Sequence, residues 1–358
     1  MEKAVIIIPA LNPDDRMIEY CESLIENGFS RIIVIDDGSD DEHCYIFDTL
    51  KSKTEIVCFR HAVNLGKGRA LKNALNIFLN FEDSKDYPGV ITVDSDGQHS
   101  VRDVIRLSEA LSEEPDKLIL GVRDFDAGGV PPKSKFGNKC TRILFRLLYG
   151  VRIQDTQTGL RAIPSELIPQ FVDLKGERFE YEMGVLIAAA HKNIKIKELP
   201  IETIYENDNK GTHFNPIRDS LAIYSLLLGS FVKYIFSSFI SFLIDIALFR
   251  IALNILGSLG ALINSRILIA TIFSRIISSL FNYTLNKNVV FKSNGKNKEL
   301  LVKYYLLCAI QMGCSAGLVT LLYFLFPISE TLIKIVVDSV LFVISYKIQN
   351  KYIFRESK

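Results

Sequence analysis

The sequence of 358 residues lacks an excess of charge of either sign. Its 42 Lys and Arg residues are balanced by 41 Asp and Glu residues, which leaves a formal net charge of +1 at pH 7. A protein that binds nucleic acid by neutralising many phosphates needs a strong basic excess. The composition therefore argues against a nucleic-acid-binding protein.

The sequence also lacks cysteine spacings that would form disulfides or a metal site. Its six cysteines stand at positions 21, 44, 58, 140, 308 and 314. We therefore expect a reducing cytoplasmic setting for the region before residue 230. No signal peptide is expected, because Met1 leads within a few residues into a strand-like run that ends at Pro9.

Three common phosphate- and calcium-binding motifs are missing. A dinucleotide-binding fold would have G-x-G-x-x-G after its first strand, where this sequence reads PALNPDD. There is no Walker-type loop, and the stretch VDSDGQH differs from a calcium loop because Gly97 comes too early and no glutamate closes it. Hydride transfer, ATP hydrolysis and a calcium-loop protein are therefore disfavoured.

Short apolar runs alternate with helical patterns in the first 205 residues. The runs lie at 4–10, 31–35, 55–59, 90–93 and 117–121, and the helical patterns include 17–26, 68–79 and 101–111. This alternation predicts an α/β domain with a mainly parallel sheet covered on both faces. Ligands of such sheets bind beyond the carboxyl ends of the strands.

The run at 90–93 ends in two carboxylates, Asp94 and Asp96, followed by the amide of Gln98. Two Asp side chains and a Gln supply hard oxygen ligands suited to Mg²⁺ or Mn²⁺ carrying a diphosphate, with water in the remaining positions. The same residues also fit a polar turn that caps the next helix. The sequence leaves both interpretations open.

Polar residues also follow the first three predicted strands. Pro9 and Asn12 end the first, and Asp36 and Asp37 end the second in an acidic turn suited to hydrogen-bonding a base or ribose. After the third, the turn NLGKG enters a helix, where Lys67 can face phosphate. Each turn alone has a structural explanation, but four turns at one sheet edge favour a binding site.

Four motifs, IIIPALN, IDDGSDD, NLGKGRAL and VDSDGQH, resemble in order and spacing the inverting family 2 glycosyltransferases with the GT-A fold. The sequence is most similar to the branch that makes polyprenyl-phosphate sugars, the dolichyl-phosphate mannosyltransferase and GtrB-like enzymes. ILGVRDF at 119–125, DTQTGLRAIP at 155–164 and the span 179–190 extend the resemblance to about residue 230.

The resemblance implies roles for individual positions. It implies that the metal and the diphosphate sugar are bound by Asp94, Asp96 and Gln98, and the nucleotide by Pro9, Asn12 and Asp37. Arg123 matches a basic residue that contacts the acceptor phosphate. Related enzymes often have arginines in the segment that follows, where this sequence has Lys133 and Lys135. A lysine keeps the charge but loses the bidentate fork of arginine.

The chemistry of sugar transfer supports the same assignments. A departing nucleoside diphosphate develops negative charge, which a divalent ion held by Asp94 and Asp96 stabilises. A lipid phosphate acceptor has a second pKa of about 6, so it is largely ionised at neutral pH and needs little help from a base. Cations must hold the two anionic substrates together, and the candidates are Arg123, Lys133, Lys135, Arg161, Lys210, His213 and Arg218.

The expected site therefore comprises four sets of residues. Asp96 and Arg123 are the expected catalytic residues, and Asp94, Asp96 and Gln98 the expected ligands of Mg²⁺ or Mn²⁺. The expected nucleotide-sugar site comprises Pro9, Asn12, Asp36, Asp37, Lys67, Asp94, Ser95 and Asp96. The expected acceptor-phosphate site comprises Arg123, Lys133, Lys135, Lys210, His213 and Arg218. Glu180 and Glu182 either orient the sugar or favour the dipole of the helix that they begin.

Two stretches have the pattern of helices at a membrane surface. Residues 133–149 place apolar side chains near one face and basic ones elsewhere, which fits either an interfacial helix or a helix docked on the sheet. Residues 216–231 begin with a proline and become apolar. The polar segment 203–215 between them is a candidate lid over the acceptor site.

The last 125 or so residues predict four membrane-spanning helices, at about 234–256, 261–285, 304–326 and 331–348, because about 20 apolar residues cross the hydrocarbon core. Lysines gather between spans two and three, and basic residues follow span four, whereas GSLG and PISE carry none. The positive-inside rule then places both termini and the catalytic domain in the cytoplasm. Similar openings (Lys-Tyr) and endings (LNKNVVFK and IQNKYIFR) suggest a doubled two-helix unit.

This C-terminal layout resembles the GtrA-like membrane domain. The expected domains are a cytoplasmic GT-A domain at 1–215, an interfacial segment at 216–232 and a GtrA-like domain at 233–358. Charges within the predicted spans, at Asp245, Arg250, Arg266, Arg275, Lys334 and Asp338, either pair as structural links or form a polar path for a lipid-linked head group.

We therefore expect an integral membrane glycosyltransferase that moves one sugar from a UDP-sugar or GDP-mannose to a polyprenyl phosphate, with inversion. Two alternatives stay open at this point. The acceptor could be a saccharide or protein, or the chain could be a lipid-linked sugar flippase or transporter with a nucleotide-sugar-binding domain. The sequence leaves the sugar, the lipid length and the oligomeric state open, with a homo-oligomer as one option.

Overall fold

The computed structural model describes residues 3–125, 132–202, 217–258, 263–326 and 329–354, and the chain divides into two compact units. We call residues 1–227 the sheet unit and residues 228–358 the helical unit. The predicted lid, with Lys210 and His213, lies outside the described residues.

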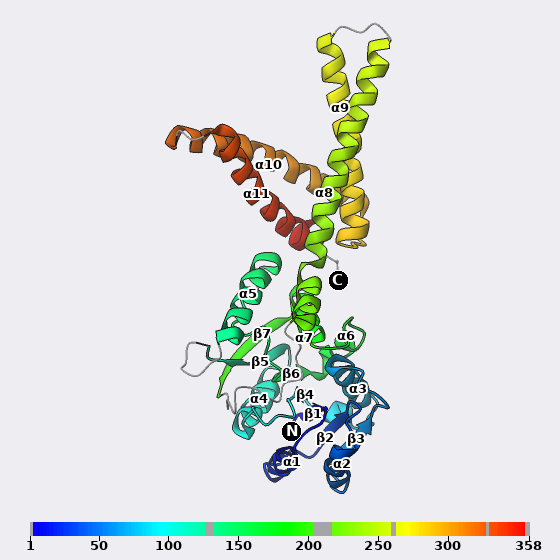
Figure 1. Ribbon diagram of the computed structural model, residues 1–358, viewed down its shortest axis with the longest axis vertical. Helices are drawn as coiled ribbons and strands as arrows, with labels where there is room; N and C mark the ends of the chain where they lie inside the picture. Colours follow the sequence, from blue (N-terminus) through cyan, green and yellow to red (C-terminus); the bar gives the residue numbers. More distant parts are fainter. Residues whose placement is uncertain (1–2, 126–131, 203–216, 259–262, 327–328, 355–358) are drawn as a thin grey trace. The chain divides into compact units, whose positions relative to one another are not determined.

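The sheet unit is built on a seven-stranded sheet with the spatial order β3-β2-β1-β4-β6-β5-β7 (Figure 1). β6 runs antiparallel to its neighbours β4 and β5, and the remaining pairs are parallel. The strands are β1 (Val5–Ala10), β2 (Ile32–Asp36), β3 (Ile56–Arg60), β4 (Gly89–Thr92), β5 (Lys117–Arg123), β6 (Arg161–Pro164) and β7 (Lys195–Ile201). The helices are α1 (Arg16–Glu26), α2 (Cys44–Lys51), α3 (Lys67–Leu79), α4 (Val101–Glu113), α5 (Pro132–Tyr149), α6 (Pro169–Val172) and α7 (Glu180–Lys192).

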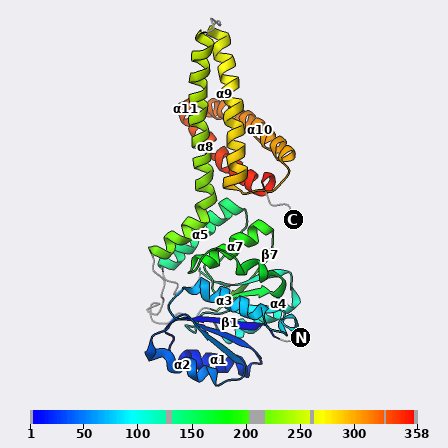
Figure 2. The ribbon, with the colours of Figure 1, turned by 90° about the vertical axis from the view of Figure 1, so that its right-hand side faces the viewer.

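Helices cover both faces of this sheet, as the sequence predicts. Successive residues of a strand point to opposite faces, so Ile6 and Ile8 join a buried core with α1, α2 and α4. On the other face α3 packs against β1 and β2, and Figure 2 shows it across the sheet from α1 and α2. The α/β fold with a mainly parallel sheet is therefore confirmed.

The sequence analysis finds five of the seven strands. β6 and β7 are not predicted as strands, although the motif DTQTGLRAIP includes β6. Because β6 is antiparallel, its first residue, Arg161, lies at the edge where β4 and β5 end. The sheet edge that carries the polar turns therefore also receives the chain that leads into β6.

Helix α5 has both a docked face and an exposed face. Phe145 and Leu148 are buried, whereas Phe136, Ile143 and Leu147 are exposed. The exposed face also carries the basic side chains of Lys135, Lys139, Arg142 and Arg146. The helix is therefore docked on the sheet unit and at the same time presents the apolar and basic surface of a membrane-surface helix.

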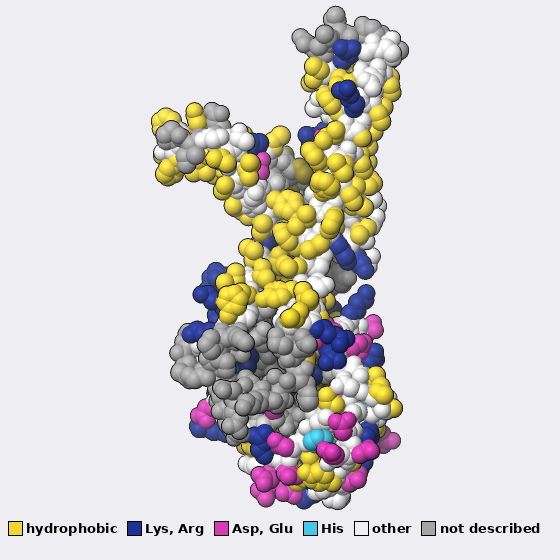
Figure 3. Space-filling view, in the orientation of Figure 1, with side chains coloured by type: hydrophobic (Ala, Val, Ile, Leu, Met, Phe, Trp, Pro, Cys, Tyr) yellow, Lys and Arg dark blue, Asp and Glu magenta, His cyan; other side chains and the backbone are white. Residues whose placement is uncertain are grey.

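The helical unit contains long helices whose surfaces are largely apolar, as Figure 3 shows. They are α8 (Arg218–Ser258), α9 (Ile263–Leu285), α10 (Asn297–Leu325) and α11 (Glu330–Ile348), with short π-helices η5 (Asn286–Val290) and η6 (Gln349–Ile353). Three described stretches are long and apolar enough to cross a membrane, namely Arg218–Ser258, Arg266–Val290 and Asn297–Leu325.

Two details of the helical unit differ from the prediction. From Arg218 on, the predicted interfacial segment and the predicted first span form one continuous helix, α8. The fourth predicted span forms α11, which has 19 residues. This helix contains Lys334, Asp338 and Lys347 and is not among the three described stretches that are apolar enough to cross a membrane. All four predicted spans are nevertheless helical over their described residues.

Reciprocal aromatic contacts support the predicted doubling of a two-helix unit. Tyr234 at the start of the first hairpin packs on Tyr346 of the second, with ring centroids 5.3 Å apart. Tyr304 at the start of the second packs on Tyr283 of the first, at 5.5 Å. Phe291 and Phe354, which follow the two π-helices, stack at 5.3 Å. Each hairpin thus holds the other through equivalent rings.

Buried amides join the same two hairpins. The side-chain amide of Asn286, at the start of η5, donates to Oε1 of Gln349, at the start of η6, over 3.0 Å. Gln349 Nε2 donates to the hydroxyls of Tyr234 and Ser345 at 3.1 Å each. Because buried polar groups need partners, these bonds fix the register between the hairpins.

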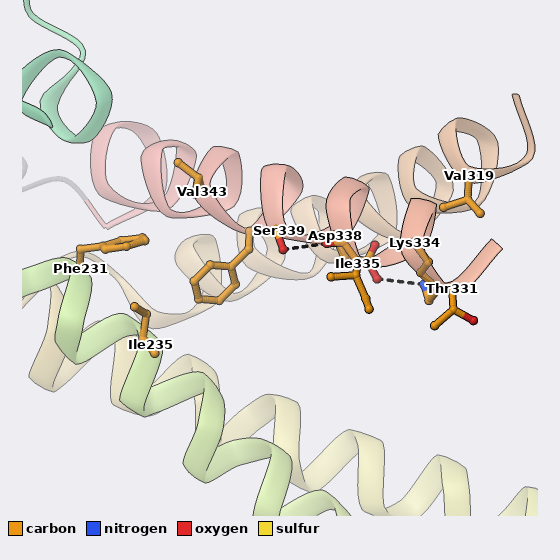
Figure 4. Close-up of a pocket in the computed structure, with 10 residues that line it drawn as sticks. Phe231, Ile235, Val319, Thr331, Lys334, Ile335, Asp338, Ser339 and Val343 are labelled. Atoms are coloured by element: carbon orange, nitrogen blue, oxygen red, sulfur yellow. Dashed lines mark hydrogen bonds and ion pairs between the residues drawn. The ribbon is translucent and has the colours of Figure 1, made fainter. Parts of the chain in front are cut away.

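Two acidic residues of the helical unit have the basic partners that a structural role requires. Asp245 lies 3.5 Å from Arg275 and accepts a hydrogen bond from Ser278 at 2.9 Å. Asp338 lies 2.9 Å from Lys334 and accepts from Ser315 at 2.5 Å. The second pair lines a largely apolar groove of about 760 Å³ between α8, α10 and α11 (Figure 4).

Gly38, in the turn after β2, lies where the backbone of the sheet edge is tightly packed. Its φ of +80° is left-handed, and a Cβ there would lie 2.4 Å from the backbone of Val63. Gly150 has a similar φ of +74°, but a Cβ at that position would meet open space. We expect Gly150→Ala to cost about 1 kcal/mol of stability from backbone strain alone. We expect Gly38→Ala to cost about 1–3 kcal/mol more, because a backbone segment must move.

Circular dichroism melting of the full-length protein in detergent measures the difference. An equal drop in Tm for the two variants would contradict the packing described for this turn.

Candidate active site

The acid pair lies in the turn that follows β4. Val93 extends the strand by donating its backbone N–H to Ile7 at 2.9 Å, and Asp94 comes next. Asp96 Oδ1 accepts the backbone N–H of Gln98 at 3.1 Å, and Gly97 takes a left-handed φ of +72°. Ser95 lies between the two acids. The sequence therefore delivers Asp94, Ser95, Asp96 and Gln98 to one turn at the sheet edge.

Lys67, the first residue of α3, reaches this turn. Its Nζ lies 2.6 Å from Asp94 Oδ1 and 3.2 Å from Glu182 Oε1, on α7. His99 Nε2 lies 3.4 Å from the other oxygen of Asp94. Gly159 presses its backbone against the same carboxylate, because a Cβ there would lie 2.4 Å from Asp94 Oδ2. Four segments that are distant in sequence thus meet around Asp94.

The charges of this cluster set the protonation of its members. Burial would raise the pKa of Asp94, but the Lys67 ammonium and His99 outweigh it and hold that pKa far below its usual value. Burial and then the Asp94 charge raise the pKa of Asp96. Burial would lower the pKa of Lys67, but Asp94 and Glu182 outweigh it and raise that pKa. Lys67 is therefore an ammonium and Asp94 a carboxylate at neutral pH.

The oxygen donors of this turn fit a divalent ion whose coordination is completed by other ligands. In the described part of the chain, no cluster of three or more His, Cys, Asp and Glu side chains has the arrangement of a metal site. Asp94, Asp96 and Gln98 are hard oxygen donors of the kind that Mg²⁺ and Mn²⁺ prefer, and Mg²⁺ in particular is often bound by one or two carboxylates with water and phosphate.

The predicted nucleotide residues form one connected turn region. Asn12 has a left-handed φ of +48° and bonds Asp40 through both its amide nitrogen and oxygen at 2.8 Å. Pro9 is buried in β1, and Asp36, also buried, accepts the backbone N–H of Ser39 at 2.8 Å. The turns after β1 and β2 are therefore held together.

Asp37 joins the turn after β2 to the loop that leads to Lys67. Its carboxylate accepts the backbone N–H groups of Leu65 at 2.9 Å and Gly66 at 2.8 Å, and it lies 2.7 Å from His61 Nδ1. Asp37 is buried, with 4% of the residue exposed. Asp37 thus shapes the Gly-rich turn in this structure.

Arg123, the last residue of β5, is held by an acid that the sequence analysis does not single out. Its Nε donates to Asp155 Oδ2 at 2.7 Å and its Nη2 to Asp155 Oδ1 at 3.1 Å. The guanidinium also lies over the ring of Phe125, 5.0 Å from its centroid. Asp155 is fully buried. Such a two-point contact fixes the orientation of an arginine more firmly than a single bond.

The other predicted cations differ in position. Arg161 is buried, and its guanidinium donates to the backbone oxygens of Thr158 at 2.9 Å and Glu182 at 2.6 Å. Lys133 and Lys135 lie in the first turn of α5, with Lys135 exposed, and Arg218 begins α8. Arg161 is therefore a buried residue beside the acid cluster, bonded to the backbone of Glu182.

The two glutamates at the start of α7 have different contacts. Glu180 Oε1 accepts the backbone N–H groups of Glu177 at 2.9 Å and Arg178 at 3.3 Å, which is a helix-start role. Glu182 faces Lys67 in the acid cluster. Of the two predicted alternatives, helix capping fits Glu180, and a place in the site fits Glu182.

Comparisons with known proteins identify two families along the chain. Residues 5–166 match the family model described as glycosyl transferase family 2, and residues 233–354 match the one described as the GtrA/DPMS transmembrane domain. An uncharacterised protein of Methanocaldococcus jannaschii is 30% identical over 231 residues, which cover 63% of this chain and 92% of that protein.

Two named relatives match the same region. The UDP-N-acetylglucosamine–dolichyl-phosphate N-acetylglucosaminyltransferase of Methanococcus voltae is 26% identical over 240 residues, or 62% of this chain and 94% of that protein. The polyprenol monophosphomannose synthase of Mycolicibacterium smegmatis is 25% identical over 216 residues, or 56% of this chain and 77% of that protein. The chain belongs to the family 2 glycosyltransferases, and it is a membrane protein that joins a GT-A-like domain to a GtrA/DPMS transmembrane domain.

Proposed function

We propose that this glycosyltransferase moves one sugar from a nucleotide sugar to a polyprenyl phosphate, with inversion at the anomeric carbon, at the cytoplasmic face of a membrane. The observation that carries the proposal is the meeting of Asp94, Asp96 and Lys67 at one sheet edge with Arg123 at the end of β5, in a chain with a transmembrane domain. The proposal is supported by the names of two relatives, one of which includes dolichyl phosphate and the other polyprenol monophosphomannose.

The donor half of the site has the charges that a nucleoside diphosphate requires. Asp94, Asp96 and Gln98 would hold Mg²⁺ or Mn²⁺, which supplies positive charge to the leaving diphosphate. Lys67 lies at the amino end of α3, where backbone N–H groups and the helix dipole favour phosphate. The turns that contain Asn12, Asp36 and Asp37 would receive the base and ribose.

The acceptor half needs a fixed cation more than it needs a base. A polyprenyl phosphate is mostly ionised at neutral pH, because its second pKa is about 6. Arg123, oriented by Asp155, would hold that phosphate and direct one oxygen toward the anomeric carbon. The basic and apolar face of α5 would lie on the membrane surface from which the lipid arrives.

One assay tests the function directly. Purified protein is incubated with a short polyprenyl phosphate and labelled UDP-sugars and GDP-mannose, with and without chelator. We expect label in the organic phase for one donor, and none after chelation. Label that stays in the aqueous phase with every donor would contradict the proposed lipid acceptor.

Asp96→Asn tests the acid pair. The substitution removes a negative charge and replaces a carboxylate ligand by a neutral amide, while keeping the shape of the side chain. We expect sugar transfer to fall by about 100-fold or more, because stabilisation of the leaving group is lost. The control is Asp116→Asn, which removes an exposed acid paired with Lys195 at 2.8 Å. Transfer within about two-fold of wild type for Asp96→Asn would count against the assignment.

Arg123→Lys tests the acceptor half. Lysine keeps the charge but loses the two-point contact with Asp155, so the cation is no longer oriented. We expect the KM for polyprenyl phosphate to rise by about ten-fold while the KM for the donor changes little. Arg106→Lys, on α4 and paired with Asp103 at 2.7 Å, is the matched control. An effect confined to the donor KM would place Arg123 in the other half of the site.

Cysteine labelling tests the orientation. In a variant whose six native cysteines are replaced, Asn294→Cys lies between α9 and α10, and Ser329→Cys lies between α10 and α11. We expect a membrane-impermeant maleimide to label Ser329→Cys on intact cells and Asn294→Cys only after permeabilisation. The reverse pattern would place the catalytic domain outside the cytoplasm.

A further inference from the structure

Both oxygens of Asp94 are already engaged by other groups. Oδ1 lies 2.6 Å from the Lys67 ammonium, and Oδ2 lies 3.4 Å from His99 Nε2 and against the backbone of Gly159. A divalent ion that coordinates Oδ1 would therefore compete with Lys67 for this oxygen. A divalent ion and the Lys67 ammonium that share one oxygen of Asp94 would also repel each other.

Lys67 has a second carboxylate that can keep it in the site. Glu182 lies 3.2 Å from the same nitrogen, and its helix is packed tightly against α3. A Cβ on Gly68 would lie 2.6 Å from the Cβ of Tyr181, so the starts of α3 and α7 leave no space between them. Lysine carries its charge on a flexible four-carbon stem, which lets the ammonium shift over a short distance.

The other buried cation near this cluster cannot move in the same way. Arg161 is buried and fixed by its bonds to the backbone oxygens of Thr158 and Glu182. Lys67 is therefore the cation whose position can change when a ligand enters. A diphosphate would give its ammonium a new anionic partner at the amino end of α3.

We propose that Lys67 is a positioning residue that withholds Asp94 from the divalent ion until a nucleoside diphosphate enters, with Glu182 retaining the ammonium as it shifts to the phosphates. The inference rests on the proposed function, because it assumes that Asp94 is a metal ligand. It makes metal binding and nucleotide binding strongly cooperative. Metal alone must separate Lys67 from Asp94 and leave the ammonium with Glu182 as its one partner, whereas metal with nucleotide also gives it the phosphates as partners.

Binding of Mn²⁺ to the full-length protein in detergent tests this coupling, with free Mn²⁺ measured by electron paramagnetic resonance. Titrations are made without nucleotide, with UDP and with GDP. For the wild type we expect weak binding alone and binding about ten-fold tighter or more with the matching nucleotide. For Lys67→Met we expect Mn²⁺ alone to bind about ten-fold more tightly than to wild type, and the effect of nucleotide to shrink.

Three further variants separate this inference from a general loosening of α3. Lys72→Met removes another ammonium of α3, which lies 2.9 Å from Glu177, and should leave Mn²⁺ affinity unchanged. Lys67→Arg keeps the charge and should not tighten Mn²⁺ binding in the absence of nucleotide. Glu182→Gln removes the second anchor, so Lys67 should stay on Asp94 and weaken Mn²⁺ binding even with nucleotide. This last variant tests the inference if Lys67→Met does not fold.

The outcomes distinguish this inference from the proposed function. In one outcome, wild type binds Mn²⁺ with nucleotide and transfers sugar, but Lys67→Met binds Mn²⁺ alone no more tightly than Lys72→Met does. This outcome refutes the proposal that Lys67 withholds Asp94 from the metal, and the proposed function stands. If wild type binds no Mn²⁺ even with nucleotide, the metal assignment and this inference fall together. Tighter binding by both Lys67→Met and Lys72→Met would also refute the role of Lys67.

Discussion

The ion pair between Lys67 and Asp94 is the contact at the centre of the polar sheet edge, because it joins the start of α3 to the turn after β4. Asp94 follows β4, Lys67 begins α3, and Glu182 on α7 shares the same ammonium. Unpaired charges in such a partly buried place would be costly, so the folded edge requires these partners to be present together. The neighbouring turns are then built around this cluster through backbone hydrogen bonds to Asp37.

Local patterns were enough to predict the first five strands and the polar turns at their ends. These strands are short apolar runs with β-branched residues, and parallel pairing brings their carboxyl ends to one edge. β6 and β7 gave weaker signals. β6 is four residues long and ends in Pro164, and β7 reads KIKELPI, with charged residues and a proline that suit the edge of a sheet.

Contacts between distant residues were the part that the sequence could not show. Asp155 is separated by 32 residues from Arg123, and no spacing rule connects them. Glu182 and Lys67 are 115 residues apart. Lys67, Glu182 and Arg123 were candidates from the sequence, whereas Asp155 was not. The pairing in both cases arises from strand order, in particular from the antiparallel insertion of β6 between β4 and β5.

In the helical unit, the sequence repeats predicted a duplication that the structure makes concrete. The first helix of each hairpin packs on the second helix of the other through tyrosines, and two amides at the starts of the π-helices complete the contact. Such reciprocal packing needs matching residues in both halves, which explains why LNKNVVFK and IQNKYIFR are alike. The helix boundaries were harder to predict, since α8 continues without a break through a change in composition.

The segment that leads into β6 links the two proposed halves of the site through very few bonds. Asp155 accepts hydrogen bonds from Arg123, and four residues later the backbone of Gly159 packs against the carboxylate of Asp94. A short, buried stretch of backbone cannot stretch or slide much, so a displacement at one end is transmitted to the other. In the proposed function, binding of the acceptor phosphate at Arg123 would therefore be transmitted through this segment to the donor side of the site at Asp94.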